Sequence, residues 1–146
     1  MVEFSIAAVL LLTVIFGIMD FARAVYADHF VSYAAQEGTR YAIVRGGTFA
    51  GTTCTTTSTM DCAATAGDVQ SYVQSIAPPG ISGTSVSASA TWPGTTVSGS
   101  ATGCSTINNP GCDVKVTVTY TFSFLLPFMP TAGITFSSSS EQVIQE

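Results

Sequence analysis

The chain has 146 residues, of which 47% are hydrophobic and only 9% are charged, against roughly 25% charged residues in an average soluble domain. Four Lys and Arg residues stand against nine Asp and Glu residues, which excludes a nucleic-acid binder that works through a basic surface. One His and four Cys residues argue against a histidine-based metal centre or a catalytic triad.

The charges divide the chain into two parts. Three of the four basic residues lie at or before Arg45, and only Lys115 follows it. Ser and Thr make up 34 of the 101 residues after Arg45. A surface that stays soluble through hydroxyl groups rather than ion pairs suits an extracellular protein. We therefore expect an apolar stalk at residues 1–46 and a Ser/Thr-rich head at residues 47–146.

The stalk begins with 16 consecutive uncharged residues between Glu3 and Asp20, rich in Leu, Ile, Val and Phe. As a helix this run is about 24 Å long, slightly short of the roughly 30 Å core of a bilayer, and its apolar neighbours can extend it. The run is apolar on every face, so it must lie in lipid or inside other protein. We expect the membrane or filament-core segment at residues 1–22. The alternative is a cleaved secretory signal, but no small-residue cleavage site follows the run.

Helical spacing continues beyond the apolar run, and the first clear stop is Gly46–Gly47. We predict one helix over residues 3–45, wholly apolar in its first half and amphipathic in its second half. The amphipathic half needs a surface to pack on, which the head can supply. Its polar side carries two oppositely charged pairs three residues apart, Asp20 with Arg23 and Glu37 with Arg40.

The head is predicted to contain one short helix and several strands. Helical spacing covers residues 68–76 and ends at Pro78–Pro79–Gly80, after a long loop at residues 48–65. Alternating apolar and polar residues predict strands at 86–92, 113–124 and 134–144, with a weaker strand at 95–98. The alternation is lost at Ser137–Ser140, which allows a bulge there. The predicted fold class is α+β: a long N-terminal helix packed by its second half on a small antiparallel β-sheet, with one short extra helix.

The four cysteines fall in two pairs, each eight residues apart in a turn-rich segment, Cys54 with Cys62 and Cys104 with Cys112. Four cysteines allow three pairings. Two local disulfides are the most economical choice, each worth about 2.5 kcal/mol in the chain-entropy model. A zinc site made of all four thiolates is the rival, although the spacing lacks any CxxC. Disulfides would place the head in an oxidising compartment.

The sequence carries no motif for catalysis. GxSxG, HExxH, a P-loop and GxGxxG do not occur. Asp61, Asp68 and Asp113 are scattered acids without a paired partner in the sequence. We therefore expect a protein that is not an enzyme, with no cofactor, no metal and no nucleic-acid partner.

Several segments resemble the TadE-like pilins of tight adherence pili. In the stalk these are Val2–Phe4, Phe16–Ala24 and Ala34–Ala42. Near the C-terminus they are Val116–Tyr120, Leu125–Phe128 and Ser138–Glu141. The resemblance covers residues 2–45 and 113–146, and the stalk motif is the more specific of the two.

The resemblance implies a type IV-like pilin that is made as a precursor, held in the inner membrane, cut by a prepilin peptidase and assembled by pilus machinery. The product would be an extracellular helical filament at a prokaryotic cell surface, a homo-oligomer joined through N-terminal helices. In such pilins an acid near the mature N-terminus, usually the fifth residue, pairs with the terminal amine of a neighbour. Glu3 matches that position. Since it is the third residue here, either two mature residues precede Met1 or the cleavage differs.

Two surfaces are candidates for contacts between subunits. The first comprises the acid and the large apolar residues of the stalk: Glu3, Phe4, Leu10, Leu11, Leu12, Ile15, Phe16 and Phe21. The second is an unusually apolar connection after the clearest strand: Leu125, Leu126, Phe128 and Met129. The alternatives are an acid at the headgroup level for Glu3 and a loop folded under the sheet end for the connection.

We expect a structural filament subunit for cell attachment. The alternatives are a membrane-anchored minor or accessory pilin and a tethered extracellular binding domain.

Overall fold

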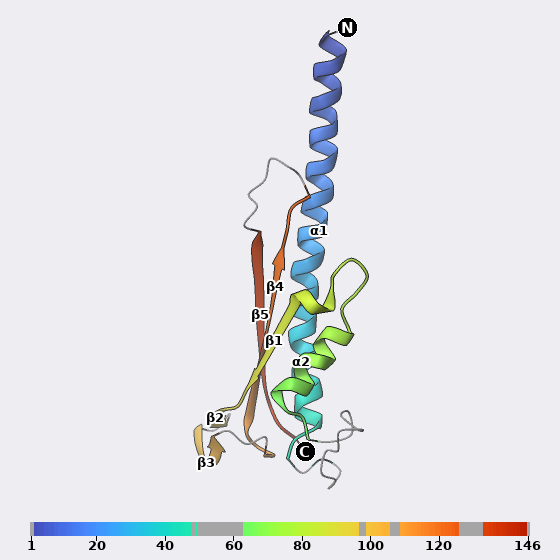
Figure 1. The fold of residues 1–146 in the computed structure, drawn as a ribbon. Helices are drawn as coiled ribbons and strands as arrows, with labels where there is room; N and C mark the ends of the chain where they lie inside the picture. Colours follow the sequence, from blue (N-terminus) through green and yellow to red (C-terminus); the bar gives the residue numbers. More distant parts are fainter. Residues whose placement is uncertain are drawn as a thin grey trace.

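The computed structural model describes residues 2–47, 49, 63–96, 99–105, 109–125 and 133–145. Its dominant element is helix α1 (Val2–Val44), whose N-terminal half projects beyond the rest of the molecule (Figure 1). The C-terminal half of α1 lies along a β-sheet, and the short helix α2 (Ala66–Ser75) lies beside it. This arrangement confirms the predicted α+β fold.

Helix α1 is continuous because it contains no Pro and is rich in good helix formers such as Ala and Leu. Its 43 residues correspond to a length of about 65 Å. The predicted range of 3–45 differs from the observed bounds by one residue at each end. Both predicted ion pairs form, with N–O distances of 2.8 Å for Arg23–Asp20 and 3.1 Å for Arg40–Glu37.

Three antiparallel strands form the main sheet, in the order β1-β4-β5. Their bounds are Val86–Thr91 for β1, Asp113–Phe122 for β4 and Ile134–Val143 for β5. A short 3-10 helix, η1 (Gly83–Ser85), precedes β1. Two further strands, β2 (Pro93–Thr96) and β3 (Gly99–Ser105), form a separate antiparallel pair at the end of the molecule that is remote from the N-terminus (Figure 1).

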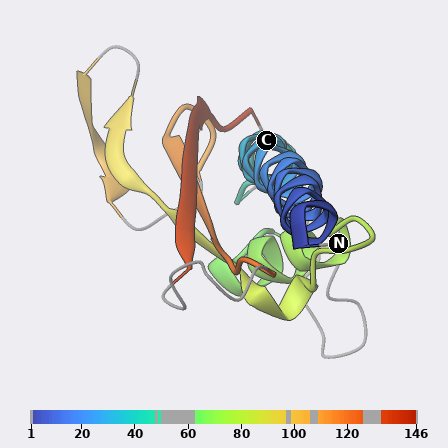
Figure 2. The same cartoon turned by 90° about the horizontal axis from the view of Figure 1, so that it is seen from above.

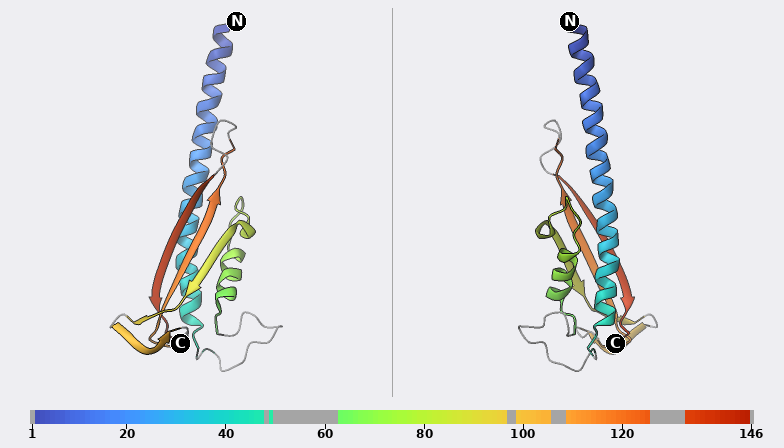
Figure 3. Two further views of the ribbon diagram at one scale, coloured as in Figure 1. Left: turned by 60° about the vertical axis from the view of Figure 1, so that its left-hand side comes forward. Right: turned by 90° about the vertical axis from the view of Figure 1, so that its right-hand side faces the viewer.

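Both helices cover the same face of the sheet, with α1 against β4 and β5 and α2 against β1 (Figure 2). The predicted alternation of β4 is confirmed, because Val114, Val116 and Val118 are buried while the residues between them are half-buried. Strand β1 alternates in the same way. The views in Figure 3 show that this layer ends near the middle of α1, and that no described helix or strand lies along the helix from there to its N-terminus. The core therefore lies between the sheet, α2 and the second half of α1.

Helix α2 begins two residues before the predicted start, because Thr65 caps its N-terminus. The Thr65 side chain accepts a hydrogen bond from the Asp68 backbone N–H, and the Asp68 carboxylate accepts one from the Thr65 backbone N–H at 3.0 Å. This reciprocal pair satisfies two backbone donors that the first turn leaves without helical partners. The buried face of α2 consists of Val69 and Val73.

Two predictions for the head differ from the structure. Strand β5 pairs with β4 in unbroken register, with Ser140 opposite Val116 and Ser137 opposite Thr119, so the bulge allowed at Ser137–Ser140 does not form. The ladder needs only backbone groups, and serine fits both faces of an edge strand. Strand β3 was not predicted, because its sequence lacks regular alternation. The loop predicted at 48–65 lies outside the described residues, apart from residues 49 and 63–65.

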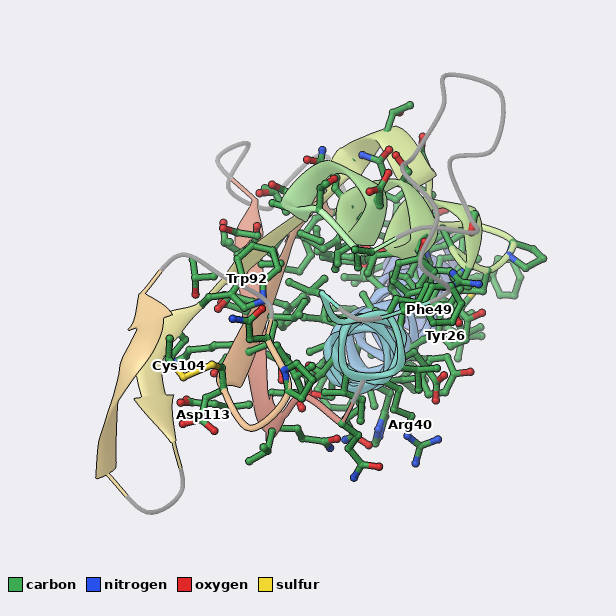
Figure 4. All side chains as sticks on the ribbon, turned by 90° about the horizontal axis from the view of Figure 1, so that it is seen from below. Tyr26, Arg40, Phe49, Trp92, Cys104 and Asp113 are labelled. Atoms are coloured by element: carbon green, nitrogen blue, oxygen red, sulfur yellow. A yellow bond between two sulfur atoms is a disulfide. The ribbon has the colours of Figure 1, made fainter. Side chains whose placement is uncertain are left out.

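The disulfide predicted between Cys104 and Cys112 is present and joins β3 to the segment just before β4 (Figure 4). Cys104 lies in a strand rather than in the turn-rich segment that was expected. Because these two thiols are joined, a zinc site that uses all four thiolates is excluded. The predicted Cys54–Cys62 pair lies outside the described residues.

Candidate assembly surface

The N-terminal half of α1 exposes a continuous apolar surface. From Val2 to Met19, a stretch that the structure describes in full, no residue is buried. The exposed fraction of the predicted assembly residues ranges from 44% for Ile15 to 80% for Phe4. The whole predicted apolar set is exposed: Phe4, Leu10, Leu11, Leu12, Ile15, Phe16 and Phe21. Contiguous apolar patches of this kind mark contacts with protein or with a membrane.

The same helix satisfies the requirements for crossing a bilayer. It is long enough and apolar enough to span a membrane, and its most apolar stretch has no residue buried against the head. By length and composition alone, the core helix of a soluble protein or a signal sequence would also qualify as a membrane span. Here, however, the apolar stretch lies outside the core.

Glu3 lies in the first turn of α1 and is exposed. A carboxylate in this position interacts favourably with the positive end of the helix dipole. No described part of the head lies beside this turn (Figure 1), and the exposed Glu3 side chain is accessible to a neighbouring molecule.

The second half of α1 differs in the size of its side chains as well as in their burial. Small residues, among them Ala34, Ala35 and Gly38, are buried against the sheet and α2. A Cβ atom added at Gly38 would lie 3.0 Å from a methyl group of Val73 and 3.1 Å from a methyl group of Val116. Glycine therefore allows α1 to approach both α2 and β4 closely.

A polar junction marks the boundary between the two halves of α1. Asp20 is only 4% exposed. One of its carboxylate oxygens accepts a hydrogen bond from Arg23 Nη1 at 2.8 Å, and the other accepts one from the Leu125 backbone N–H at 3.0 Å. The Arg23 guanidinium lies 5.3 Å from the centre of the Phe122 ring. Asp20 thus attaches the segment after β4 to the helix at the point where the apolar surface ends.

This junction corrects the expectation that Asp20 lies on the polar side of the helix. The ion pair with Arg23 forms as predicted, but the carboxylate points into the molecule. Its second partner, the N–H of Leu125, is 105 residues away in sequence, so no local pattern could have indicated it.

The predicted contact segment after β4 is described only at its start. Leu125 is 78% exposed, and its contact with a neighbouring subunit stays a prediction. Leu126, Phe128 and Met129 lie outside the described residues.

At the opposite end of the head, aromatic residues connect α1 to α2. The rings of Tyr41 and Tyr72 stack with their centres 4.5 Å apart, and the Arg45 guanidinium lies 4.4 Å from the centre of the Tyr41 ring. Burial raises the pKa of the Tyr72 hydroxyl, and the nearby Glu37 carboxylate raises that pKa further. This end of the molecule therefore holds the C-terminal end of α1 firmly to the head.

The sequence of α1 is similar to that of a known protein family. Residues 1–40 match the family model described as TadE-like protein. The N-terminal segment of this chain is TadE-like. The matched residues include all of the exposed apolar surface and most of the part of α1 that packs on the sheet. A search of curated proteins and a search of solved structures each found no match.

The match to the TadE-like model covers less than a third of the chain, and together with the apolar helix it suggests a pilin-like component of a Tad pilus. TadE-like proteins are generally non-enzymatic. For TadE-like proteins, partners in the Tad pilus machinery and a location at the cell surface are expected, and the apolar helix of this chain is consistent with membrane insertion. In the part of the chain that the structure describes, no group of three or more His, Cys, Asp or Glu residues is arranged to hold a metal ion.

Proposed function

We propose that this protein is a structural subunit of an extracellular pilus-like filament and assembles through its apolar N-terminal helix. The observation that carries the proposal is the exposed surface from Val2 to Met19 in a segment that is TadE-like. Fully burying one Leu, Ile or Phe side chain is worth about 1.5–3 kcal/mol. A surface with this many such side chains requires an apolar environment that the head does not provide.

Two environments supply that burial at different stages. Before assembly, the helix lies in the inner membrane, where its length and composition fit. After assembly, the same helix is surrounded by the helices of identical subunits. The head, for which we keep the range 47–146, then forms the outer surface of the filament around stalks formed by residues 1–46. Processing by a prepilin peptidase and transfer by the pilus machinery connect the two stages.

Glu3 is the residue to which we assign the register between subunits. A carboxylate within a bundle of apolar helices is costly unless it is paired. Residues 1–22 contain no basic residue, so this stretch offers Glu3 no basic side chain as a partner. We assign the terminal amine of a neighbouring subunit as its partner, and this pairing would fix the stagger of adjacent helices.

The test is to replace Glu3 by Ala and to examine sheared surface material by electron microscopy. We expect the Glu3→Ala protein to remain in the membrane fraction while filaments disappear or become much shorter. Glu37→Ala is the matched control, because Glu37 is an acid on the same helix that pairs with Arg40 outside the apolar half. Glu37→Ala should form normal filaments. Normal filaments from Glu3→Ala would refute the assembly role of Glu3.

The same preparation separates the alternative functions. Abundant fibres that contain this chain support a main filament subunit. If the chain remains only in the membrane fraction while fibres of another composition form, it is a minor or accessory pilin. If no fibres form at all, the tethered binding domain is the better account.

A further inference from the structure

Four large apolar side chains are exposed at the end of the head that faces the apolar half of α1. Their exposed fractions are 70% for Phe21, 41% for Val25, 78% for Leu125 and 45% for Ile134. We refer to these four residues as the rim. Two belong to α1, one follows β4 and one begins β5, so the rim is built by folding and is not a local sequence motif.

The rim borders an apolar cavity of about 510 Å³ between α1 and the ends of β4 and β5. Phe21, Val25 and Ile134 of the rim line the cavity. Its wall extends from Gly17, within the apolar half of α1, to Phe136 in β5. The cavity therefore lies where the apolar half of α1 meets the end of β4 and the start of β5.

The rim is held at a defined height along α1. The Leu125 N–H donates to Asp20 at 3.0 Å, and Phe122, which pairs with Ile134 in the sheet, lies against Arg23. These contacts place the end of β4 and the start of β5 level with residues 20–25 of the helix, and Figures 1 and 3 show both near the middle of α1. Because α1 is helical throughout, no flexible linker separates this height from the apolar half.

The height of the rim corresponds to the interfacial layer of a bilayer. The 18 residues from Val2 to Met19 span about 27 Å as a helix, close to the roughly 30 Å of hydrocarbon, with about 5–8 Å of headgroup region on each side. Phe21 and Val25 follow Met19 by about 3 Å and 9 Å along the helix. The residues of the rim therefore fall at or just outside the edge of the hydrocarbon.

We propose that the rim is a lipid-binding surface, which sits in the boundary between headgroups and acyl chains of the membrane that holds α1, with the cavity open to acyl chains. The occupant is lipid because the rim continues the apolar surface of the spanning segment. Two carboxylates also line the cavity. Asp20 is turned inward onto Arg23 and Leu125, and Asp28 follows Met19 by about 14 Å along the helix, on the water side of the rim. Exposed Arg23 lies at the level of the headgroups, where a long basic side chain is favourable. The proposal rests on membrane insertion of α1, as proposed above.

Tryptophan fluorescence quenched by brominated lipids tests this proposal in nanodiscs that hold one copy of the full chain. Trp92 is the only Trp in the sequence, and its indole N–H has no hydrogen-bond partner among the described residues, so Trp92→Phe provides a background free of Trp and removes no hydrogen bond seen there. Into this background we would place single tryptophans at Leu125 and Ile134 in the rim, at Met19 in the spanning segment and at Val44 as a control. Val44 is apolar and 53% exposed, at the far end of α1.

With lipids brominated near the headgroup end of their acyl chains, Leu125→Trp and Ile134→Trp should lose emission together with Met19→Trp, whereas Val44→Trp should keep it. If Met19→Trp is quenched while both rim variants behave like Val44→Trp, the rim proposal is wrong and membrane insertion stands. If Met19→Trp is not quenched, insertion itself fails. If the rim tryptophans shift to shorter wavelength only in discs that hold several copies, a second copy covers the rim and lipid binding is overturned.

Discussion

The two halves of α1 have the same backbone geometry but opposite relations to the rest of the molecule. From Val2 to Met19 no residue is buried, whereas the stretch from Ala27 to Ala42 supplies a large part of the core. The first half is rich in Leu, Ile and Phe, and the second half places small residues such as Gly38 at its contacts. The half that is more apolar is therefore the one that the described residues of the head leave uncovered.

The comparison shows that helix formation and burial are separate requirements. Local propensity makes both halves helical. Burial is supplied within the chain for the second half, while for the first half it must come from outside. The head is consequently expected to be stable without help from the first half, and the first half is expected to depend on lipid or on sister helices.

The largest effect is expected from a charge in the middle of the first half. Leu11→Asp should weaken membrane integration by about 3–4 kcal/mol, because Leu favours and Asp strongly disfavours the centre of a membrane helix. The measurement is the fraction of protein that resists alkaline extraction from membranes. Val44→Asp is the matched control, since Val44 has a similar exposure of 53% against 62% for Leu11. If alkaline extraction released the same fraction of both variants, the proposed difference between the two halves of α1 would be contradicted.

The two glycines of α1 provide a direct comparison of packing. Gly38→Leu should destabilise the head by about 3 kcal/mol, because its Cβ already meets Val73 and Val116 at 3.0 and 3.1 Å and the larger side chain overpacks the core. Gly17→Leu should leave the unfolding of the head unchanged, since nothing lies within 4 Å of a Cβ at that position. Denaturant unfolding followed by Trp92 fluorescence measures both. Similar losses in the two variants would show that the first half also contributes to the folded head.

A smaller effect is expected from the disulfide of the head. Cys104→Ser should lower the free energy of unfolding by about 2.5 kcal/mol, because the Cys104–Cys112 bond closes a short loop in the unfolded chain. Membrane integration should not change, since β3, which contains Cys104, lies at the end of the molecule remote from the N-terminus (Figure 1). If the variant instead lost membrane integration, stalk and head could not be treated as separately stabilised.

The smallest effect concerns the pH dependence of the contact between Tyr41 and Tyr72. Burial raises the pKa of Tyr72 above its usual value of about 10, with Glu37 adding to the increase. The folded state therefore holds this proton more tightly than the unfolded chain does. The resulting stability is fully present below the unfolded pKa and is lost as the pH rises through the folded pKa.

Tyr72→Phe should remove this part of the alkaline destabilisation. The measurement is the unfolding free energy of parent and variant from about pH 9 upward, since the unfolded tyrosine titrates near 10. The parent should lose more stability than Tyr72→Phe over that range. Parallel curves for the two proteins would contradict the assignment.

The long helix and the core of the sheet could be predicted because their signals are local. The apolar run, the absence of Pro and the stop at Gly46–Gly47 fixed α1 to within one residue at each end. The alternation of Val114, Val116 and Val118 identified the central strand and its buried face. The spacing of Cys104 and Cys112 favoured the local disulfide that forms.

The features that sequence reasoning missed depend on partners distant in the chain. Asp20 is buried because it accepts the N–H of Leu125, 105 residues away. Strand β3 forms by pairing with β2 and carries no alternation of its own. The regular register of β5 at Ser137–Ser140 is imposed by β4, since serine alone specifies neither face. The rim belongs to the same class, as it combines α1 with the ends of two strands.

The most direct test of the proposed role of the apolar helix is the mass of the particles that the full-length chain forms once detergent has been removed. Analytical ultracentrifugation of the purified protein, transferred to buffer without lipid, should find assemblies far heavier than the single chain of 15.1 kDa, held together through the N-terminal half of α1. A stable, soluble species at 15.1 kDa would mean that residues 2–19 tolerate water, and the proposed role of this helix would then be wrong.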